Sequence, residues 1–156
     1  MDKIDFTCLK SDIEDYMTTV IYVNGINLKN VIEEIETAQL AKKDLFVQNG
    51  CYEGICFFIA FQYKNHFLGK TLNEYIYEGQ RYTLYDYKCS GIPGDHSLAC
   101  KISIKSKEII WHDFKNFSKV IPYELDYKDL EFHFCKEQYL HAINSAKNNT
   151  NKNVNA

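Results

Sequence analysis

Runs of hydrophobic residues at alternating and helical spacing divide this chain of 156 residues into a predicted series of strands and two helices. The segment 16–23, YMTTVIYV, is rich in β-branched and aromatic residues and predicts a strand that ends at the turn-forming pair Asn24-Gly25. Asn27 is then placed to cap a helix over about residues 28–38. The apolar residues of this helix recur at helical spacing: Leu28, Val31, Ile32 and Ile35.

The middle of the chain reads as a set of strands. Residues 55–63, ICFFIAFQY, are apolar on both faces and predict a central strand that is covered on both sides. Segments 81–89 and 100–105 are predicted to pair, and a tight turn leads from the second of them into a strand over 108–114. Residues 123–134 alternate again.

The last predicted element is a helix over about residues 136–146, which has one apolar stripe. The residues of that stripe are Cys135, Tyr139, Ala142, Ile143 and Ala146. Residues 147–156 are polar and aperiodic and predict a disordered tail. Consecutive hairpins between an early and a late helix predict a single α+β domain over residues 1–146 with a largely antiparallel sheet.

Composition and charge narrow the classes of function. A hydrophobic fraction of 46% supports a packed core, and a net charge of −3 argues against a surface that neutralises phosphates. We therefore expect no nucleic-acid partner, and a basic protein fits the charge better. The N-terminus lacks a secretory signal and no apolar run reaches the roughly 20 residues that span a bilayer, so we expect a soluble cytoplasmic protein without a membrane partner. No phosphate-binding or other cofactor motif is present, so no cofactor is predicted.

Cysteine and histidine residues around the segment 85–102 allow one metal hypothesis. Cys89, His96, Cys100 and His112 offer the thiolate and imidazole ligands that tetrahedral zinc prefers. Their spacing does not match the paired ligands of structural zinc sites, and alternation with Ile102 turns Cys100 toward the core. A thiol nucleophile paired with a histidine, such as Cys89 with His96 or His112, is a related alternative.

Carboxylates off the apolar stripe of the first helix suggest a protein-binding surface. Glu33, Glu34 and Glu36 are predicted to form an exposed acidic ridge. Asp95 and His96 are predicted to lie at the exposed tip of the loop after the strand over 81–89, and could contact the same partner.

The loop and the following strands resemble a group of small uncharacterised bacterial proteins. Members of that group carry a C-x-C-G-x-x-G-C-W-P-L type turn, then R-I and V-x-W strands and an F-x-F-x-x-x-Q-Y helix entry. The matching residues here are Cys89, Gly94, Leu98, Ile102, Ile110, Trp111, Phe132, Phe134, Gln138 and Tyr139. Tyr87 and the segment Asp95-His96-Ser97 replace most of the cysteine motif. The resemblance implies a shared fold and a structural role for the turn, and it implies no activity.

Three hypotheses for function follow from the sequence. The first is a non-enzymatic binding protein of the immunity or antitoxin kind, which blocks a toxin or another basic protein through its carboxylates and tyrosines. The second is a zinc or thiol site at Cys89, His96, Cys100 and His112. The third is an enzyme of unrecognised type, although the absence of common catalytic motifs favours a protein that is not an enzyme.

Overall fold

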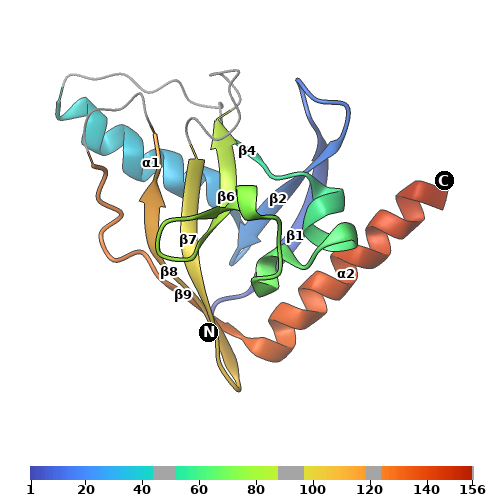
Figure 1. Ribbon diagram of the computed structural model, residues 1–156. Helices are drawn as coiled ribbons and strands as arrows, with labels where there is room; N and C mark the ends of the chain where they lie inside the picture. The colour runs from blue at the N-terminus through green and yellow to red at the C-terminus, as the bar shows by residue number, and fades with distance from the viewer. Residues whose placement is uncertain (44–51, 88–96, 119–123, 156) are drawn as a thin grey trace.

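The chain folds into two antiparallel sheets and two α-helices in a computed structural model that describes residues 1–43, 52–87, 97–118 and 124–155 (Figure 1). The strands are β1 (Ile4–Lys10), β2 (Met17–Val23), β3 (Ile26–Asn27), β4 (Tyr52–Gly54), β5 (Ile76–Tyr77), β6 (Arg81–Tyr87), β7 (Ser97–Ile104), β8 (Glu108–Asn116) and β9 (Phe132–Cys135). The α-helices are α1 (Leu28–Ala41) and α2 (Lys136–Asn155). Together they form a single α+β domain with mostly antiparallel pairing, which confirms the predicted fold class.

The smaller sheet has the order β1-β2-β3, and its first strand was not predicted. In β1 the residues Ile4 and Phe6 are buried while Asp5, Thr7 and Leu9 are exposed, as period-two geometry requires. The strand pairs with β2 along its whole length, from Ile4 opposite Val23 to Lys10 opposite Met17. The β2 strand itself and the turn after it agree with the prediction, since Asn24 and Gly25 both have positive φ.

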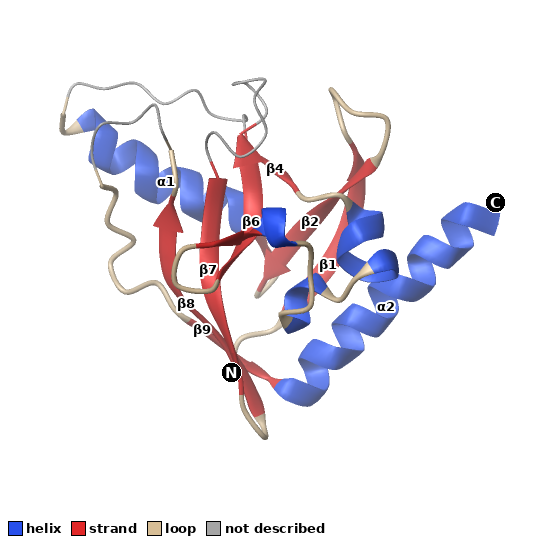
Figure 2. Cartoon of the chain, in the orientation of Figure 1, coloured by secondary structure: helices blue, strands red, loops and turns tan. Residues whose placement is uncertain are grey.

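The larger sheet has the order β4-β6-β7-β8-β9, with β5 paired to β6 (Figure 2). Strands β6, β7 and β8 overlap the predicted segments 81–89, 100–105 and 108–114, although β7 begins at Ser97 and β8 continues to Asn116. Residues 88 and 89 lie outside the described range. A register shift in β7 lies between Ala99 and Lys101. Cys100, at this shift, is buried as predicted, Ile102 is half-buried, and Ile104, at the end of the strand, is exposed.

Glycine at position 54 lets the two sheets join. The amide of Thr19 in β2 donates to the carbonyl of Ile55 at 2.8 Å, directly after β4. A Cβ atom at Gly54 would lie 1.8 Å from the carbonyl oxygen of Thr19, so only glycine permits this approach. The junction fixes the β1–β2 hairpin over the edge of the larger sheet.

Residues 55–63 do not form the predicted central strand. After Cys56 the backbone turns into a short helical segment that includes a π-helix over Ile59–Tyr63. Phe57, Ala60 and Phe61 are buried and Phe58 is exposed, which is helical spacing. A short run of apolar residues fits both the strand period and the helical period. Packing of Phe61 against Phe6, with 5.1 Å between the ring centroids, favours the helix.

Both helices are longer than predicted. α1 begins at Leu28 with Asn27 as its N-cap, as predicted, but continues to Ala41. α2 lies alongside β1 (Figure 1, red), where the side-chain amide of Gln138 donates to the carbonyl of Ile4 at 2.7 Å and its oxygen accepts from the Ile4 amide at 3.1 Å. The apolar stripe of α2 ends at Ala146, yet the helix continues to Asn155, within the segment 147–156 that was predicted to be a disordered tail.

Candidate functional site

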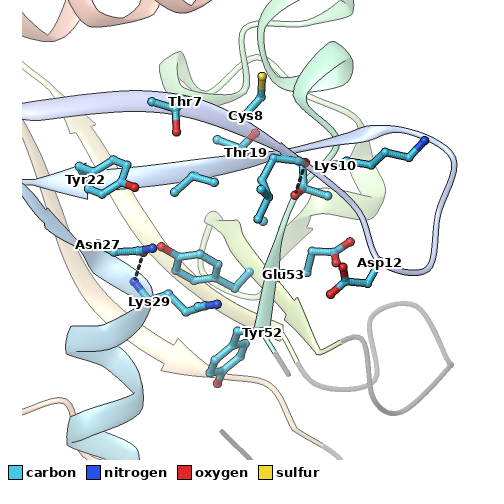
Figure 3. A pocket seen from close by; sticks show the side chains of 15 residues that line it. Thr7, Cys8, Lys10, Asp12, Thr19, Tyr22, Asn27, Lys29, Tyr52 and Glu53 are labelled. Carbon is cyan, nitrogen blue, oxygen red and sulfur yellow. Dashed lines mark hydrogen bonds between the residues drawn. The ribbon is translucent and has the colours of Figure 1, made fainter. Parts of the chain in front are cut away.

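A pocket of about 350 Å³ lies under the β1–β2 hairpin, between the start of α1 and strands β4 and β6 (Figure 3). Side chains of the hairpin, including Thr7, Val20 and Tyr22, line one wall. The aromatic rings of Tyr52 and Tyr85, with centroids 5.9 Å apart, line the opposite wall. The volume is at the lower end of the range for small-molecule pockets.

One end of the pocket is the N-terminus of α1. The side chain of Asn27 accepts a hydrogen bond from the Lys29 amide at 3.1 Å, which caps the helix (Figure 3). The side chain of Lys29 extends from this turn towards β4 (Figure 3). No acidic residue occupies the first turn of α1, so Lys29 is the charged group at the positive end of the helix dipole.

Carboxylates lie at the other end, where β4 meets the loop of the hairpin. The Ser11 hydroxyl donates to Glu53 at 2.6 Å, and the same oxygen accepts from the amides of Ile13 and Glu14. These bonds hold Asp12 in the lining of the pocket beside β4 (Figure 3). The Lys10 side chain extends away from the pocket, with its amine 3.7 Å from Asp15 (Figure 3).

Tyr85, whose ring lines the pocket, has a buried hydroxyl. The residue is 2% exposed and its oxygen is closed off from solvent. The amide of Lys29, which donates to Asn27, also lies close enough to the Tyr85 hydroxyl to lower its pKa slightly. Burial, with the negative charge of Glu33 nearby, raises the pKa of Tyr85, so the hydroxyl keeps its proton.

A second polar group lies behind Tyr52, around Glu36 of α1. The Tyr52 hydroxyl donates to Glu36 Oε2 at 2.7 Å, the Tyr127 hydroxyl donates to the same oxygen, and the Asn116 amide donates to it at 3.3 Å. Burial raises the pKa of Glu36 and outweighs these three hydrogen bonds, which lower it. The group connects α1, β4, β8 and the segment before β9, and its carboxyl is held away from solvent.

The predicted acidic ridge on α1 is therefore wrong in one residue. Glu34 is exposed and Glu33 is half-buried, but Glu36 is only 1% exposed. Glu36 belongs to the buried stripe of α1, which is Leu28, Ile32, Glu36 and Leu40. The i, i+4 spacing of that stripe was the signal in the sequence that could have identified it.

The structure describes two of the four residues of the zinc hypothesis, Cys100 and His112. Cys100 is completely buried, and burial raises the pKa of its thiol well above the ordinary range, which disfavours the thiolate that a metal needs. His112 is half-buried and its Nε2 lies 2.7 Å from the Ser103 hydroxyl. Cys89 and His96, like Asp95 of the partner-binding hypothesis, lie outside the described residues. Within the described ranges no three histidine, cysteine or acidic residues are grouped as metal ligands.

The tip of the β1–β2 hairpin, residues 9–17, carries a surface that sequence analysis missed. Leu9 and Ile13 are 63% and 61% exposed, and Tyr16 and Met17 are exposed as well. Between them lie the exposed carboxylates of Asp12, Glu14 and Asp15. Partial burial, together with the charges of Glu14, Glu53 and Asp86, raises the pKa of Tyr16 to about 12. The tip therefore combines apolar side chains with a negative field.

Comparisons with known proteins add no assignment. The chain matches no protein-family model, no curated protein and no solved structure. The resemblance to the bacterial group therefore stays a prediction. Neither α1 nor α2, as far as their residues are described, is long and apolar enough to cross a membrane.

Proposed function

We propose that this chain is a non-enzymatic cytoplasmic binding protein of the immunity or antitoxin kind, which blocks a cationic protein by docking through the hairpin tip. The observation that carries the proposal is the interleaving of exposed Leu9 and Ile13 with the carboxylates of Asp12, Glu14 and Asp15. Exposed aliphatic side chains on a rigid hairpin gain free energy when a partner buries their apolar area. The surrounding carboxylates exclude acidic partners and accelerate association with basic ones.

The rigidity of the tip supports this role. The Ser11 hydroxyl accepts from the amides of Ile13 and Glu14 and donates to Glu53, so the loop is fixed in the free protein. The Thr18 hydroxyl donates to the carbonyl of Leu9 at 3.0 Å and closes the base of the loop. A preorganised loop loses little conformational entropy when it binds.

Outside the hairpin tip, Glu34 on α1 is an exposed carboxylate that we include in the proposed partner surface, with the half-buried Glu33 next to it in the sequence. Glu36 has no part in the proposed surface because it is buried. Asp95 and His96 stay predictions for the partner surface.

The experiment is affinity capture from the native cell followed by binding kinetics with the purified partner. We expect a stoichiometric basic protein whose association rate constant falls at least about tenfold in the Glu14→Lys/Asp15→Lys variant and falls with added salt. Ile13→Ser should mainly raise the dissociation rate constant, because it removes an apolar anchor.

The matched control is Glu78→Lys/Glu124→Lys, which makes the same change of charge at exposed positions away from the tip. Equal association rates for the tip and control variants would reject the hairpin tip as the docking surface. Capture without any stoichiometric protein partner would reject the binding function itself.

A further inference from the structure

Three polar side chains on strands β7 and β8 form a group that protein docking at the hairpin tip does not use. The Ser103 hydroxyl lies 2.7 Å from Nε2 of His112, and Nδ1 of the same ring lies 3.6 Å from a carboxylate oxygen of Asp113. Serine, imidazole and carboxylate in this order are the arrangement that activates a hydroxyl as a nucleophile. None of the three residues lines the pocket, and the turn between β7 and β8 projects on the side away from the β1–β2 hairpin (Figure 1).

The backbone of β8 places the Asp113 carboxylate beside the ring of His112. In a regular strand these two neighbours would point to opposite faces, because successive side chains alternate. Here the pairing of β7 with β8 shifts by one residue, so that Asp113 and Phe114 both lie opposite Cys100. Asp113 has a φ of +52°, in the left-handed region. A β-bulge of this kind changes the direction of a side chain, and left-handed residues other than glycine are concentrated at functional sites.

Two cationic side chains hold Asp113 in place and keep it ionised. Nε of Arg81 donates to the Asp113 carbonyl at 2.9 Å, and the Lys101 amine lies 3.2 Å from the carboxylate oxygen that faces His112. The hydrogen bond from Lys101 lowers the pKa of Asp113. A carboxylate beside Nδ1 favours the tautomer with the proton on that nitrogen, so Nε2 of His112 accepts from the Ser103 hydroxyl. The His112 side chain is 27% exposed, so reagents in solution can reach it.

We infer that Ser103 is a site of covalent acylation, which takes one acyl group from an activated ester or thioester. Oγ of Ser103 forms a bond to the acyl carbon while Nε2 of His112 takes the hydroxyl proton. The bond from the acyl carbon to the leaving oxygen or sulfur then breaks, and the leaving group departs with the proton from Nε2. The products are a serine ester and a free alcohol or thiol. One transfer per chain modifies the protein without a catalytic cycle, so the inference is independent of the binding function proposed for the hairpin tip.

The test is reaction of the whole chain with p-nitrophenyl acetate, followed by the absorbance of released nitrophenolate and by peptide mass spectrometry. We expect a burst of about one nitrophenolate per chain, and an acetyl ester on Ser103. Hydroxylamine should remove this acetyl group, because hydroxylamine cleaves esters but not the amides that acetylated lysines form. The proposal is overturned if Ser103 stays unmodified, or if lysine amides are the only products.

Variants separate the roles of the three residues. Ser103→Ala should abolish the burst, and His112→Gln should slow it at least about a hundredfold, the contribution of a general base. Asp113→Asn should also slow the burst, because it removes the charge that holds the proton on Nδ1. The controls Ser106→Ala and His141→Gln remove the same two groups at exposed positions outside the site and should react as the wild type does.

Thermal unfolding separates the reaction from folding, since each variant should unfold in a single cooperative transition as the wild type does. Bursts of equal rate in His112→Gln and His141→Gln would show that the imidazole does not activate Ser103, and would reject the proposal. A burst that survives in Ser103→Ala would place the reactive group elsewhere and reject it as well.

Discussion

The Tyr52 hydroxyl donates a hydrogen bond to Glu36 at 2.7 Å in the interior of the domain, and so connects the edge strand β4 to α1. Tyr127 and Asn116 donate to the same carboxyl oxygen. Three donors would stabilise a carboxylate, but burial raises the pKa of Glu36 in spite of them. Folding therefore shifts Glu36 towards the neutral acid, relative to the unfolded chain.

This balance predicts how stability depends on pH. When folding raises the pKa of a glutamate, its contribution to the free energy of unfolding is fully present below the unfolded pKa near 4.3. The contribution is lost as pH rises through the pKa of the folded state. Glu36→Gln mimics the neutral acid, so the variant should lack this decline, which has a slope of at most about 1.4 kcal/mol per pH unit. Urea denaturation of the variant and the wild type from pH 4 to pH 8 measures the difference.

Asp86 also lowers the free energy of unfolding as pH rises, since burial raises the pKa of its carboxyl. The difference between wild type and Glu36→Gln isolates Glu36, and the exposed Glu34→Gln serves as the control. Parallel pH profiles for wild type and Glu36→Gln would show that folding does not raise the pKa of Glu36.

His66 predicts a pH effect of the opposite sign. The ring is buried, with Nε2 2.7 Å from the Thr83 carbonyl and Nδ1 2.8 Å from the Thr71 hydroxyl. A carbonyl only accepts, so Nε2 carries the proton and Nδ1 accepts from Thr71. Burial lowers the pKa of His66 to about 4. The contribution of His66 to the free energy of unfolding is thus complete above pH 6.5 and is lost as pH falls through about 4. The total loss is roughly 3 kcal/mol.

NMR measures the His66 titration directly. The ring signals of His66, assigned by their loss in His66→Gln, should keep the shifts of neutral imidazole between pH 7 and pH 5. A titration midpoint near 6.5 would contradict the prediction.

Local signals in the sequence predicted much of the fold. Asn27 capped the first helix as expected because its side chain reaches the Lys29 amide, an interaction within three residues. The strands β6, β7 and β8 and their antiparallel pairing followed from alternation and short turns. These features depend on neighbours in the chain, which a sequence displays.

The features of the fold and of the site that were not predicted depend on contacts between residues far apart in the sequence. Strand β1 alternates in the sequence, but its partner β2 lies across a six-residue loop without a glycine or proline. The segment 55–63 became helical because the core around Phe6 accepts Phe61 on a helical face. The spacing of Glu36 from Ile32 could have predicted its burial, but its hydrogen-bond partners Tyr52, Asn116 and Tyr127 are far away in the sequence and could not be predicted. The pocket, which collects residues from the hairpin, α1, β4 and β6, could not be predicted for the same reason.

Gly54 should tolerate no side chain. A Cβ atom would lie 1.8 Å from the Thr19 carbonyl oxygen, which is backbone and cannot turn aside. We expect Gly54→Ala to lower the free energy of unfolding by about 3 kcal/mol, the upper end of the usual cost of overpacking. Gly25→Ala is the control, since Gly25 has a φ of +78° but nothing within 4 Å; it should cost only about 1 kcal/mol, the strain of a left-handed alanine. Equal losses in urea denaturation would mean that the sheet junction adapts to a methyl group.

Tyr139 is expected to stabilise the core through its hydroxyl as well as its ring. The hydroxyl donates to the Phe67 carbonyl at 2.6 Å and accepts from the indole nitrogen of Trp111 at 3.1 Å, and Tyr139 and Trp111 are both completely buried. Tyr139→Phe keeps the ring but leaves a buried donor and a buried acceptor without this partner, which should cost about 1–3 kcal/mol. Trp111 is the single tryptophan of the chain, so its fluorescence reports unfolding in urea. Tyr63→Phe removes a hydroxyl from an exposed ring and should leave the midpoint unchanged. If the two variants unfold at the same urea concentration, the hydroxyl of Tyr139 adds nothing beyond the packing of its ring.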